Sequence, residues 1–332
     1  MKSVIIGIHG LGNKSSETIL RSWWLNSIQE GMYRSGKGRL AVPFELAYWA
    51  DVIHPVPLDH SIEDPNDPLF LNEHYTPGRG GENEVPPGFL KDLMLYLENQ
   101  MDRIFLNADL SINFKKVTDR LIHHYFSDLE AYYGEKCVDA TGEDCSAREA
   151  IQGRLLRKLE QYRDYRIMLI AHSMGSIVAY DVLSGLDGRI PVHTFVTIGS
   201  PLGLPVIVGR VHEARKRRGL GNTSPSVPEG ITGEWVNMSD IRDRIAIDHT
   251  LEDDYQANSL GVKALDLYVH NDYEMNGKEN PHKSFGYLRA PEMVGLISRF
   301  SDEGRSWPYR RFQHFVARFM TGIRSLAGAA RT

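Results

Sequence analysis

The chain has 332 residues, of which 42% are hydrophobic and 24% charged, a composition that excludes disordered and fibrous proteins. Its 38 lysines and arginines stand against 43 aspartates and glutamates, so the formal net charge is -5. Binding to a phosphate backbone requires a basic field over the protein surface. A general nucleic-acid-binding protein is therefore disfavoured.

The N-terminal segment shows no pattern of an export signal. The apolar run Val4–Ile8 follows Met1–Ser3 directly and is too short for the apolar region of a signal peptide. No apolar stretch approaches the roughly 18 residues that a membrane helix needs. We therefore expect a soluble, cytoplasmic protein. Cys137 and Cys145 are close enough in sequence to form a disulfide, but we expect a reduced pair in that compartment.

Short β-branched runs bounded by turn residues alternate with helical patterns along the chain, which is typical of a mainly parallel sheet flanked by helices. About six strands are predicted, at Val4–Ile8, Phe44–Trp49, Ile167–Ala171, Thr194–Ile198, Trp235–Met238 and Leu265–His270. Apolar residues at helical spacing predict helices at Glu17–Tyr33, Phe89–Phe105, Phe114–Tyr133, Arg148–Tyr162 and near Pro291–Phe300. The predicted fold class is α/β.

Two segments interrupt this alternation. Residues 51–87 are rich in proline and glycine, and residues 199–233 carry the basic cluster Arg215–Arg218 followed by Gly, Ser and Pro. We expect both to be irregular surface insertions that form a cap or lid. No aromatic residue is interleaved with the basic cluster, which disfavours a nucleic-acid patch there.

The most informative fragment is Leu169–Tyr180, with the sequence LIAHSMGSIVAY. An apolar strand passes through a turn with small residues two before and two after Ser173, and then enters an apolar helix. This is the pattern of a nucleophile elbow, with Ala171 in place of the usual first glycine. The turn would expose the Ser173 hydroxyl and leave the Met174 amide at a helix N-terminus, where an oxyanion could form. The alternative is an ordinary turn with a capping serine.

A serine nucleophile needs a base, and the base needs an orienting carboxylate. A loop after the strand Trp235–Met238 contains Asp240 and Asp243, and the residues alone allow either to be the acid. His282 follows the last predicted strand and is the predicted base. Its Nδ1–H would donate to the acid, which leaves Nε2 to face Ser173.

The fragment Ile8–Gly12, with the sequence IHGLG, closes the first strand. A His-Gly turn allows the next amide, that of Leu11, to point into the site as a second oxyanion donor. The GxxxxGK[ST] spacing of a phosphate loop is absent. Catalysis by a serine, a histidine and a carboxylate requires neither a metal nor an organic cofactor, and the histidines show no metal-ligand spacing, so no cofactor is predicted. The residues predicted to support the two turns are His9, Gly10, His172 and Gly175.

These motifs occur in the order found in the α/β-hydrolase family, and the chain resembles its serine lipases and esterases. The motifs are IHGLG, IAHSMGSIVAYDVL, TIGSPLGLP, WVNMSDIRDRIA and HKSFGYL. The acid loop is similar to that of DDHD-type phospholipases, where the acid lies six residues after an asparagine at the strand end. By that resemblance Asn237 indicates Asp243, although Arg244 follows it where proline is usual. Gly286 stands where an aromatic residue is common.

The resemblance implies a single α/β-hydrolase domain over residues 1–332, since the predicted site draws on residues near both 9 and 282. It implies cleavage of a carboxylic ester, in a small molecule or a lipid, through an acyl-enzyme. Thioester, lactone and amide hydrolysis and acyl transfer use the same groups. A catalytically silent binding protein on this fold is the alternative from another class.

The segment Trp307–Arg331 contains arginines and phenylalanines but no acidic residue. Such a helix could make peripheral contact with an anionic membrane, or it could pack on the sheet with its arginines in solvent. The sequence predicts no oligomeric state.

Overall fold

A six-stranded sheet forms the centre of the molecule, and its neighbouring strands run parallel. The structure, a computed structural model, describes residues 1–78, 129, 132–133, 137–138, 144–217, 224–246 and 249–303. In sheet order the strands are β2 (Phe44–Ala47), β1 (Ser3–Ile8), β5 (Arg166–His172), β6 (Val192–Ile198), β7 (Ile231–Ser239) and β8 (Ala264–Tyr268). Each coincides with one of the six predicted runs, so the predicted α/β architecture is confirmed.

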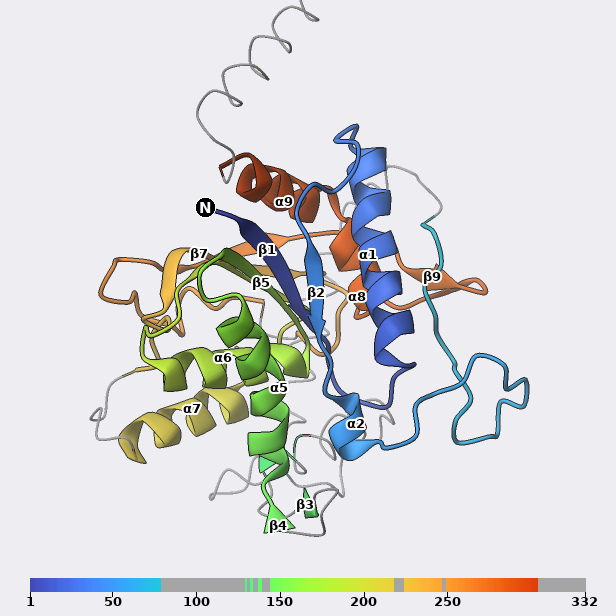
Figure 1. Cartoon of the computed structure of the whole chain (residues 1–332), viewed down its shortest axis with the longest axis horizontal. Coiled ribbons are helices and arrows are strands. Elements are labelled where there is room, and N and C mark those ends of the chain that lie inside the picture. Colours follow the sequence, from blue (N-terminus) through green and yellow to red (C-terminus); the bar gives the residue numbers. More distant parts are fainter. Residues whose placement is uncertain are drawn as a thin grey trace, which may run out of the picture.

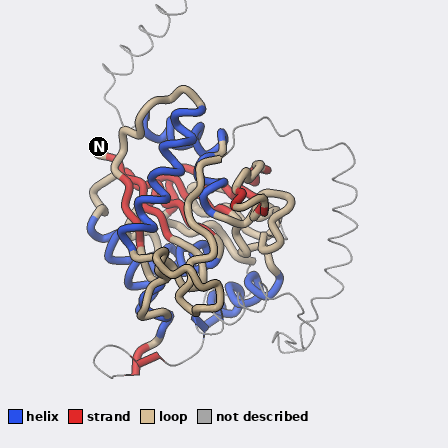
Figure 2. The backbone as a smooth tube through the Cα atoms, turned by 90° about the vertical axis from the view of Figure 1, so that its right-hand side faces the viewer, coloured by secondary structure: helices blue, strands red, loops and turns tan. Residues whose placement is uncertain are grey.

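Helices cover both faces of this sheet (Figures 1 and 2). One face packs on α1 (Glu17–Arg34), α8 (Ser284–Arg289) and α9 (Pro291–Glu303). The other packs on α5 (Ala147–Gln161), α6 (Met174–Leu186) and α7 (Pro205–Arg217). Three predicted helices, Glu17–Tyr33, Arg148–Tyr162 and Pro291–Phe300, are thereby confirmed. The predicted helix Phe89–Phe105 lies outside the described residues, and of Phe114–Tyr133 only 129, 132 and 133 are described, all three helical.

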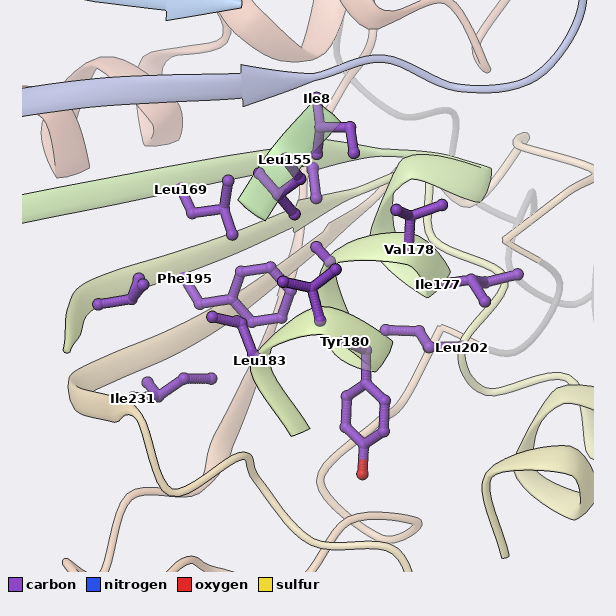
Figure 3. Close-up of a cluster of buried hydrophobic side chains, with 14 of the residues drawn as sticks. Ile8, Leu155, Leu169, Ile177, Val178, Tyr180, Leu183, Phe195, Leu202 and Ile231 are labelled. Carbon is purple, nitrogen blue, oxygen red and sulfur yellow. The ribbon is translucent and has the colours of Figure 1, made fainter. Parts of the chain in front are cut away.

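The adjacent strands β1 and β5 contain long apolar runs because both of their faces are covered. In β1 and β5 the residues Val4–Ile8 and Ile167–Ala171 are all buried. Alternate side chains of β1 enter opposite cores: Ile8 joins the cluster that includes Leu155 of α5, whereas Ile5 joins the cluster under α1. Figure 3 shows the first of these clusters. Two separate cores thus hold the sheet in place.

The two predicted insertions differ in outcome. The prediction of irregular structure was wrong for residues 205–217, which form α7 between β6 and β7. Ile207 and Val211 lie one helical turn apart and are buried in the core, so the segment covers the sheet as a crossover helix. The basic residues Arg215–Arg217 continue this helix.

The other predicted insertion, residues 51–87, is described as far as residue 78. After the short helix α2 (Ala50–Ile53) the chain continues to residue 78 without a helix, and its one regular pairing is the isolated bridge between Asp59 and Phe70. The predicted irregular structure is confirmed for residues 54–78, while 79–87 lie outside the described residues.

Two small antiparallel pairs lie outside the main sheet. The strands β3 (Cys137–Val138) and β4 (Asp144–Cys145) pair with Cys137 opposite Cys145. The strands β9 (Glu274–Met275) and β10 (Lys278–Glu279) form a hairpin between β8 and α8. Within the described ranges, no helix has both the length and the apolar character to cross a membrane. The segment Trp307–Arg331 lies outside those ranges.

Candidate active site

The predicted site residues lie at one edge of the sheet, beyond the carboxyl ends of its strands. His9 follows β1, Ser173 follows β5, Asp243 follows β7 and His282 follows β8. Because β2 and β5 flank β1 on opposite sides, the direction of chain progression reverses between β1 and β5. Ligands of parallel α/β sheets bind beside such a reversal, outside the carboxyl ends of the strands.

Ser173 occupies a sharp turn between β5 and α6. Its backbone has φ 53° and ψ -130°, a strained conformation for a residue with a side chain. The Ser173 amide donates to the Ile198 carbonyl at 3.0 Å, which anchors the turn to β6. A Cβ atom added to Gly175 would lie 2.6 Å from the His9 carbonyl oxygen. The turn therefore requires a very small residue two positions after the serine.

Hydrogen bonds join Ser173, His282 and Asp243 in a chain. His282 Nε2 lies 2.9 Å from Ser173 Oγ, and His282 Nδ1 lies 2.9 Å from both carboxylate oxygens of Asp243. A carboxylate only accepts hydrogen bonds, so Nδ1 carries the proton and Nε2 accepts from the serine hydroxyl. This arrangement can transfer the hydroxyl proton to the imidazole while the carboxylate stabilises the resulting cation.

The Asp243 side chain is fully buried but remains suited to the charged form. Burial by itself raises the pKa of Asp243, but His282 and further donors outweigh burial and hold this pKa below its ordinary value. The donors are the Ile245 amide at 2.9 Å and the Tyr287 hydroxyl at 2.8 Å. Both hydrogen bonds stabilise the negative charge of the carboxylate that faces His282.

Asp240, the alternative acid, has different partners. Its carboxylate accepts from Arg242 Nη2 at 2.8 Å and from the Asn271 amide at 2.7 Å. The structure therefore brings Asp243 rather than Asp240 to His282. Asp240 instead joins the β7 loop to the loop after β8.

The turn after β1 is oriented by His9. The Trp49 amide donates to His9 Nε2 at 3.0 Å, so the proton of the neutral ring is on Nδ1, which donates to the Gly10 carbonyl at 2.8 Å. Burial, with a smaller effect from Lys14, lowers the pKa of His9 to about 3 and keeps the ring neutral. Because a trans peptide places its N–H opposite its C=O, the Leu11 amide points away from the His9 ring.

This turn lies directly against the serine. A Cβ atom added to Gly10 would lie 2.7 Å from Ser173 Cβ. The amide of Leu11 and the amide of Met174, the first residue of α6, are therefore the two candidate donors to an oxyanion at Ser173. Lys14 Nζ donates to the Leu11 carbonyl and, at 3.1 Å, to the Gly12 carbonyl, which closes the turn from the other side.

His172, predicted to support the turn, also contacts the segment that carries His282. Its Nε2 donates to the His282 carbonyl at 2.7 Å, and the two ring centroids lie 4.9 Å apart. Burial, followed by the nearby His282, lowers the pKa of His172 well below its ordinary value. The neutral ring therefore acts as a hydrogen-bond donor that connects the β5 turn to the His282 loop.

Three further residues of the site, Asn271, Tyr287 and Gly199, were not predicted from the sequence. Asn271 Nδ2 donates to the carbonyls of Pro281 at 2.7 Å and Lys283 at 2.8 Å, on either side of His282. A Cβ atom on Gly286 would lie 1.7 Å from Asn271 Oδ1, which explains a glycine at this position. The motif HKSFGYL contains Gly286 and also Tyr287, but no local pattern indicates the partner Asn271.

Gly199, the third missed residue after Asn271 and Tyr287, lies at the end of β6. It has φ +54°, and an added Cβ would lie 2.8 Å from Asp243 Oδ2 and 3.1 Å from His282 Nδ1. Only a glycine leaves room for this histidine and carboxylate pair. The sequence pattern that could have indicated Gly199 is the motif TIGSPLGLP, in which it is the first glycine.

Comparisons with known proteins add no family to this geometry. Neither the scan of the chain against protein-family models nor the search of curated proteins finds a match. Within the part of the chain that the structure describes, no group of three or more His, Cys, Asp and Glu side chains could hold a metal ion.

Proposed function

We propose that the protein is a serine hydrolase of the α/β-hydrolase family that cleaves carboxylic esters. The observation that carries the proposal is the chain of hydrogen bonds from Ser173 through His282 to Asp243. Each member follows the carboxyl end of a different parallel strand, and the serine begins a helix in a strained turn. A serine with only a structural role would need neither the imidazole nor the strain.

In the proposed reaction Ser173 Oγ attacks the ester carbonyl while His282 Nε2 takes its proton. The carbonyl oxygen becomes an oxyanion and accepts from the amides of Leu11 and Met174, each worth about 2.7–4 kcal/mol of transition-state stabilisation. Asp243 stabilises the imidazolium. His282 then protonates the departing alcohol, which leaves an acyl group on Ser173.

Water completes the cycle. His282 removes a proton from a water molecule, which attacks the acyl carbonyl, and the same histidine returns the proton to Ser173 as the acid leaves. Neither a metal nor an organic cofactor takes part in these steps.

The proposed substrate is a small-molecule or lipid ester. A thioester, a lactone or an amide would react through the same groups, as would acyl transfer to another alcohol.

The proposal is tested by labelling with a fluorophosphonate probe and by hydrolysis of p-nitrophenyl esters of graded acyl length. The wild type should label and hydrolyse, and Ser173→Ala should abolish labelling and lower kcat by about 10⁶-fold. Ser301→Ala is the matched control, because the Ser301 hydroxyl donates only within α9, to the Ile297 carbonyl at 2.7 Å. A Ser173→Ala protein that hydrolyses esters at the wild-type rate would overturn the proposal.

A further inference from the structure

The residues 73–78, called the strap below, precede the part of the chain that is not described and lie against α1 and the segment 271–289. Side chains and backbone groups of the strap bond to both neighbours. These bonds are Tyr75 to Glu30 at 3.0 Å, Gly78 to Glu30 at 2.8 Å, Thr76 to Glu274 at 2.9 Å and Tyr273 to His74 at 2.7 Å. The strap is therefore a fixed part of the fold rather than a free loop.

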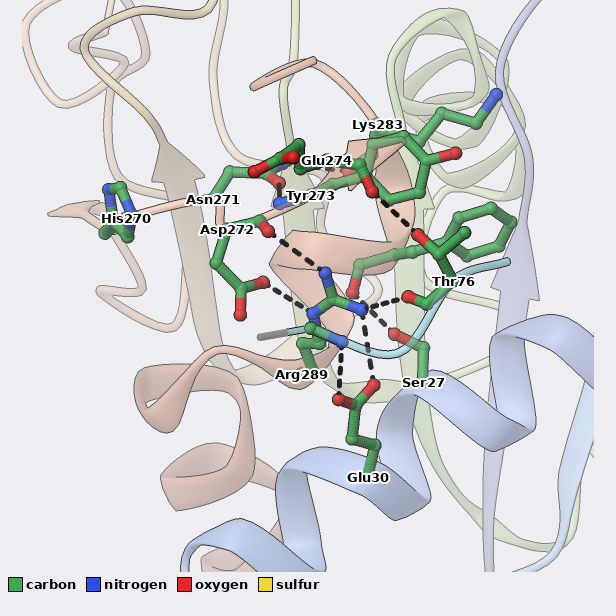
Figure 4. Close-up of polar contacts among 12 residues, drawn as sticks. Ser27, Glu30, Thr76, His270, Asn271, Asp272, Tyr273, Glu274, Lys283 and Arg289 are labelled. Atoms are coloured by element: carbon green, nitrogen blue, oxygen red, sulfur yellow. Dashed lines mark hydrogen bonds and ion pairs between the residues drawn. The ribbon is translucent and has the colours of Figure 1, made fainter. Parts of the chain in front are cut away.

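A buried arginine, Arg289, binds the strap. The Arg289 guanidinium, at the end of α8, donates to the Thr76 carbonyl at 2.7 Å and to Glu30 at 3.2 Å, and it also binds Asp272 (Figure 4). A buried charge is tolerated when it is paired and hydrogen-bonded on several sides, as here. Breaking this cluster would leave a charge without partners, so the strap is held firmly to α1 and α8.

The first residue of the strap contacts the loop that carries His282. Glu73 Oε1 accepts from Asn280 Nδ2 at 2.9 Å, and Glu73 Oε2 accepts from Lys283 Nζ at 2.8 Å. Asn280 in turn accepts from the His282 amide through its Oδ1, at 3.1 Å. One carboxylate thus binds a residue before His282 and a residue after it.

The groups around Glu73 favour its negatively charged form. Partial burial raises the pKa of Glu73, but the ammonium of Lys283 and the hydrogen bonds from Lys283 and Asn280 outweigh it and leave the pKa below its ordinary value. A charge-assisted bond to an ammonium is stronger than a neutral hydrogen bond. The anionic carboxylate therefore restrains Asn280 and Lys283, one before and one after His282.

We infer that Glu73 is a positioning residue for His282, an inference that rests on the proposed function. Asn271 restrains the same loop through the carbonyls of Pro281 and Lys283. Together the two side chains keep His282 Nε2 at 2.9 Å from Ser173 Oγ. A displacement of about 1 Å at a reacting group can lower a rate by about 10²-fold, so the loss of either restraint slows the reaction.

The experiment compares Glu73→Ala and Glu73→Gln with a variant of the same strap that leaves the hydrogen bonds to the His282 loop intact. That control is Tyr75→Phe, which keeps the ring against Phe285 and removes only the bond from the Tyr75 hydroxyl to Glu30. The measurements are kcat and KM for a p-nitrophenyl ester, the rate of fluorophosphonate labelling, and urea unfolding. We expect Glu73→Ala to lower kcat and the labelling rate by about 10- to 100-fold, with KM within about twofold of the wild type.

Glu73→Gln keeps the shape and one acceptor oxygen, so its kcat should fall between those of Glu73→Ala and the wild type. Tyr75→Phe should keep kcat within about twofold. A merely structural role would lower the stability of Glu73→Ala and Tyr75→Phe alike while leaving kcat of the folded enzyme unchanged. If Glu73→Ala does not fold, Glu73→Gln with wild-type kcat overturns the inference.

The outcomes also separate the two proposals. If the wild type labels, Ser173→Ala does not, and Glu73→Ala labels at the wild-type rate, the role of Glu73 is overturned while the serine hydrolase stands. A wild type that neither labels nor hydrolyses any ester overturns both.

Discussion

The two halves of the site are held by different kinds of contact. The serine half, residues 9–12 and 172–176, lies on the adjacent central strands β1 and β5, and close backbone approaches at Gly10 and Gly175 hold it. The histidine half, residues 240–246 and 271–287, follows β7 and the edge strand β8, and polar side chains hold it. The principal ones are those of Asn271, Tyr287 and Glu73.

This difference indicates how each half depends on the fold. In the serine half, the pairing of Ile8 with Ala171 sets the separation of the two turns, so its geometry follows once the sheet forms. In the histidine half, residues separated by 210 positions, Glu73 and Lys283, must meet as side chains. Changes in the serine half should therefore affect stability and activity together, whereas changes at Asp243 and at the side chains that hold the His282 loop should affect mainly activity.

After the loss of Ser173 itself, the largest effect is expected in the histidine half, from Asp243→Asn. The amide cannot stabilise the imidazolium and favours the wrong tautomer of His282, so kcat should fall by about 10⁴-fold while the fold persists. The matched control is Asp240→Asn, which loses the pair with Arg242 and should unfold at lower urea but keep kcat within about tenfold. Steady-state kinetics and urea unfolding of both variants test these expectations. A larger loss of kcat in Asp240→Asn than in Asp243→Asn would identify Asp240 as the acid.

In the serine half, Gly175→Ala should lower kcat less than Asp243→Asn does, and it should also lower the stability of the protein. The added Cβ would press on the His9 and Ile8 carbonyls, at 2.6 and 2.8 Å. We expect kcat to fall by about 10²-fold and the free energy of unfolding by about 1–3 kcal/mol.

The control for Gly175→Ala is Gly153→Ala in α5, where the nearest atom to an added Cβ is the end of the Arg157 side chain at 3.4 Å. An alanine there should stabilise the helix by about 0.5–1 kcal/mol and leave kcat unchanged. Urea unfolding of both variants decides the point, and wild-type stability in Gly175→Ala would contradict the close packing of the serine half.

The smallest effect on kcat, but a distinct pH dependence, is expected from His9→Asn. The folded protein holds the pKa of His9 at about 3 against 6.5 for the ordinary residue, so below pH 6.5 the unfolded chain binds the proton first. The stabilisation from the neutral ring is present above pH 6.5 and is lost as the pH falls toward 3. Asparagine can donate to the Gly10 carbonyl from the position of Nδ1 but does not titrate.

Between pH 7 and pH 5 the wild type should therefore lose about 2 kcal/mol more of its free energy of unfolding than His9→Asn loses. Urea unfolding at several pH values measures this difference. His172, whose pKa is also lowered, contributes to the pH dependence of both proteins and cancels in the comparison. An equal pH dependence in the two proteins would mean that His9 has the same pKa in the folded and the unfolded chain, which would contradict its burial as a neutral ring.

Local patterns in the sequence determined most of the fold and the serine half. Short runs rich in apolar and β-branched residues predicted the six strands. Burial on both faces explains the continuously apolar runs of β1 and β5, whereas the edge strand β8 is partly exposed. The small residues around Ser173 predicted the turn because crowding between β5, β1 and α6 leaves no room for larger ones. For α7 the same reasoning failed, since the basic cluster at its end concealed the two buried positions Ile207 and Val211.

The contacts within the histidine half exist only in the tertiary structure. The residues alone left Asp240 and Asp243 open as the proposed acid and the resemblance indicated Asp243, but only the folded chain shows which carboxylate reaches His282 once the loops after β7 and β8 meet. The same holds for Asn271 and Glu73, whose partners are distant in sequence and share no spacing with them. A pattern along the chain records which side chains a turn can hold, but a contact between separate loops exists only after the sheet brings them together.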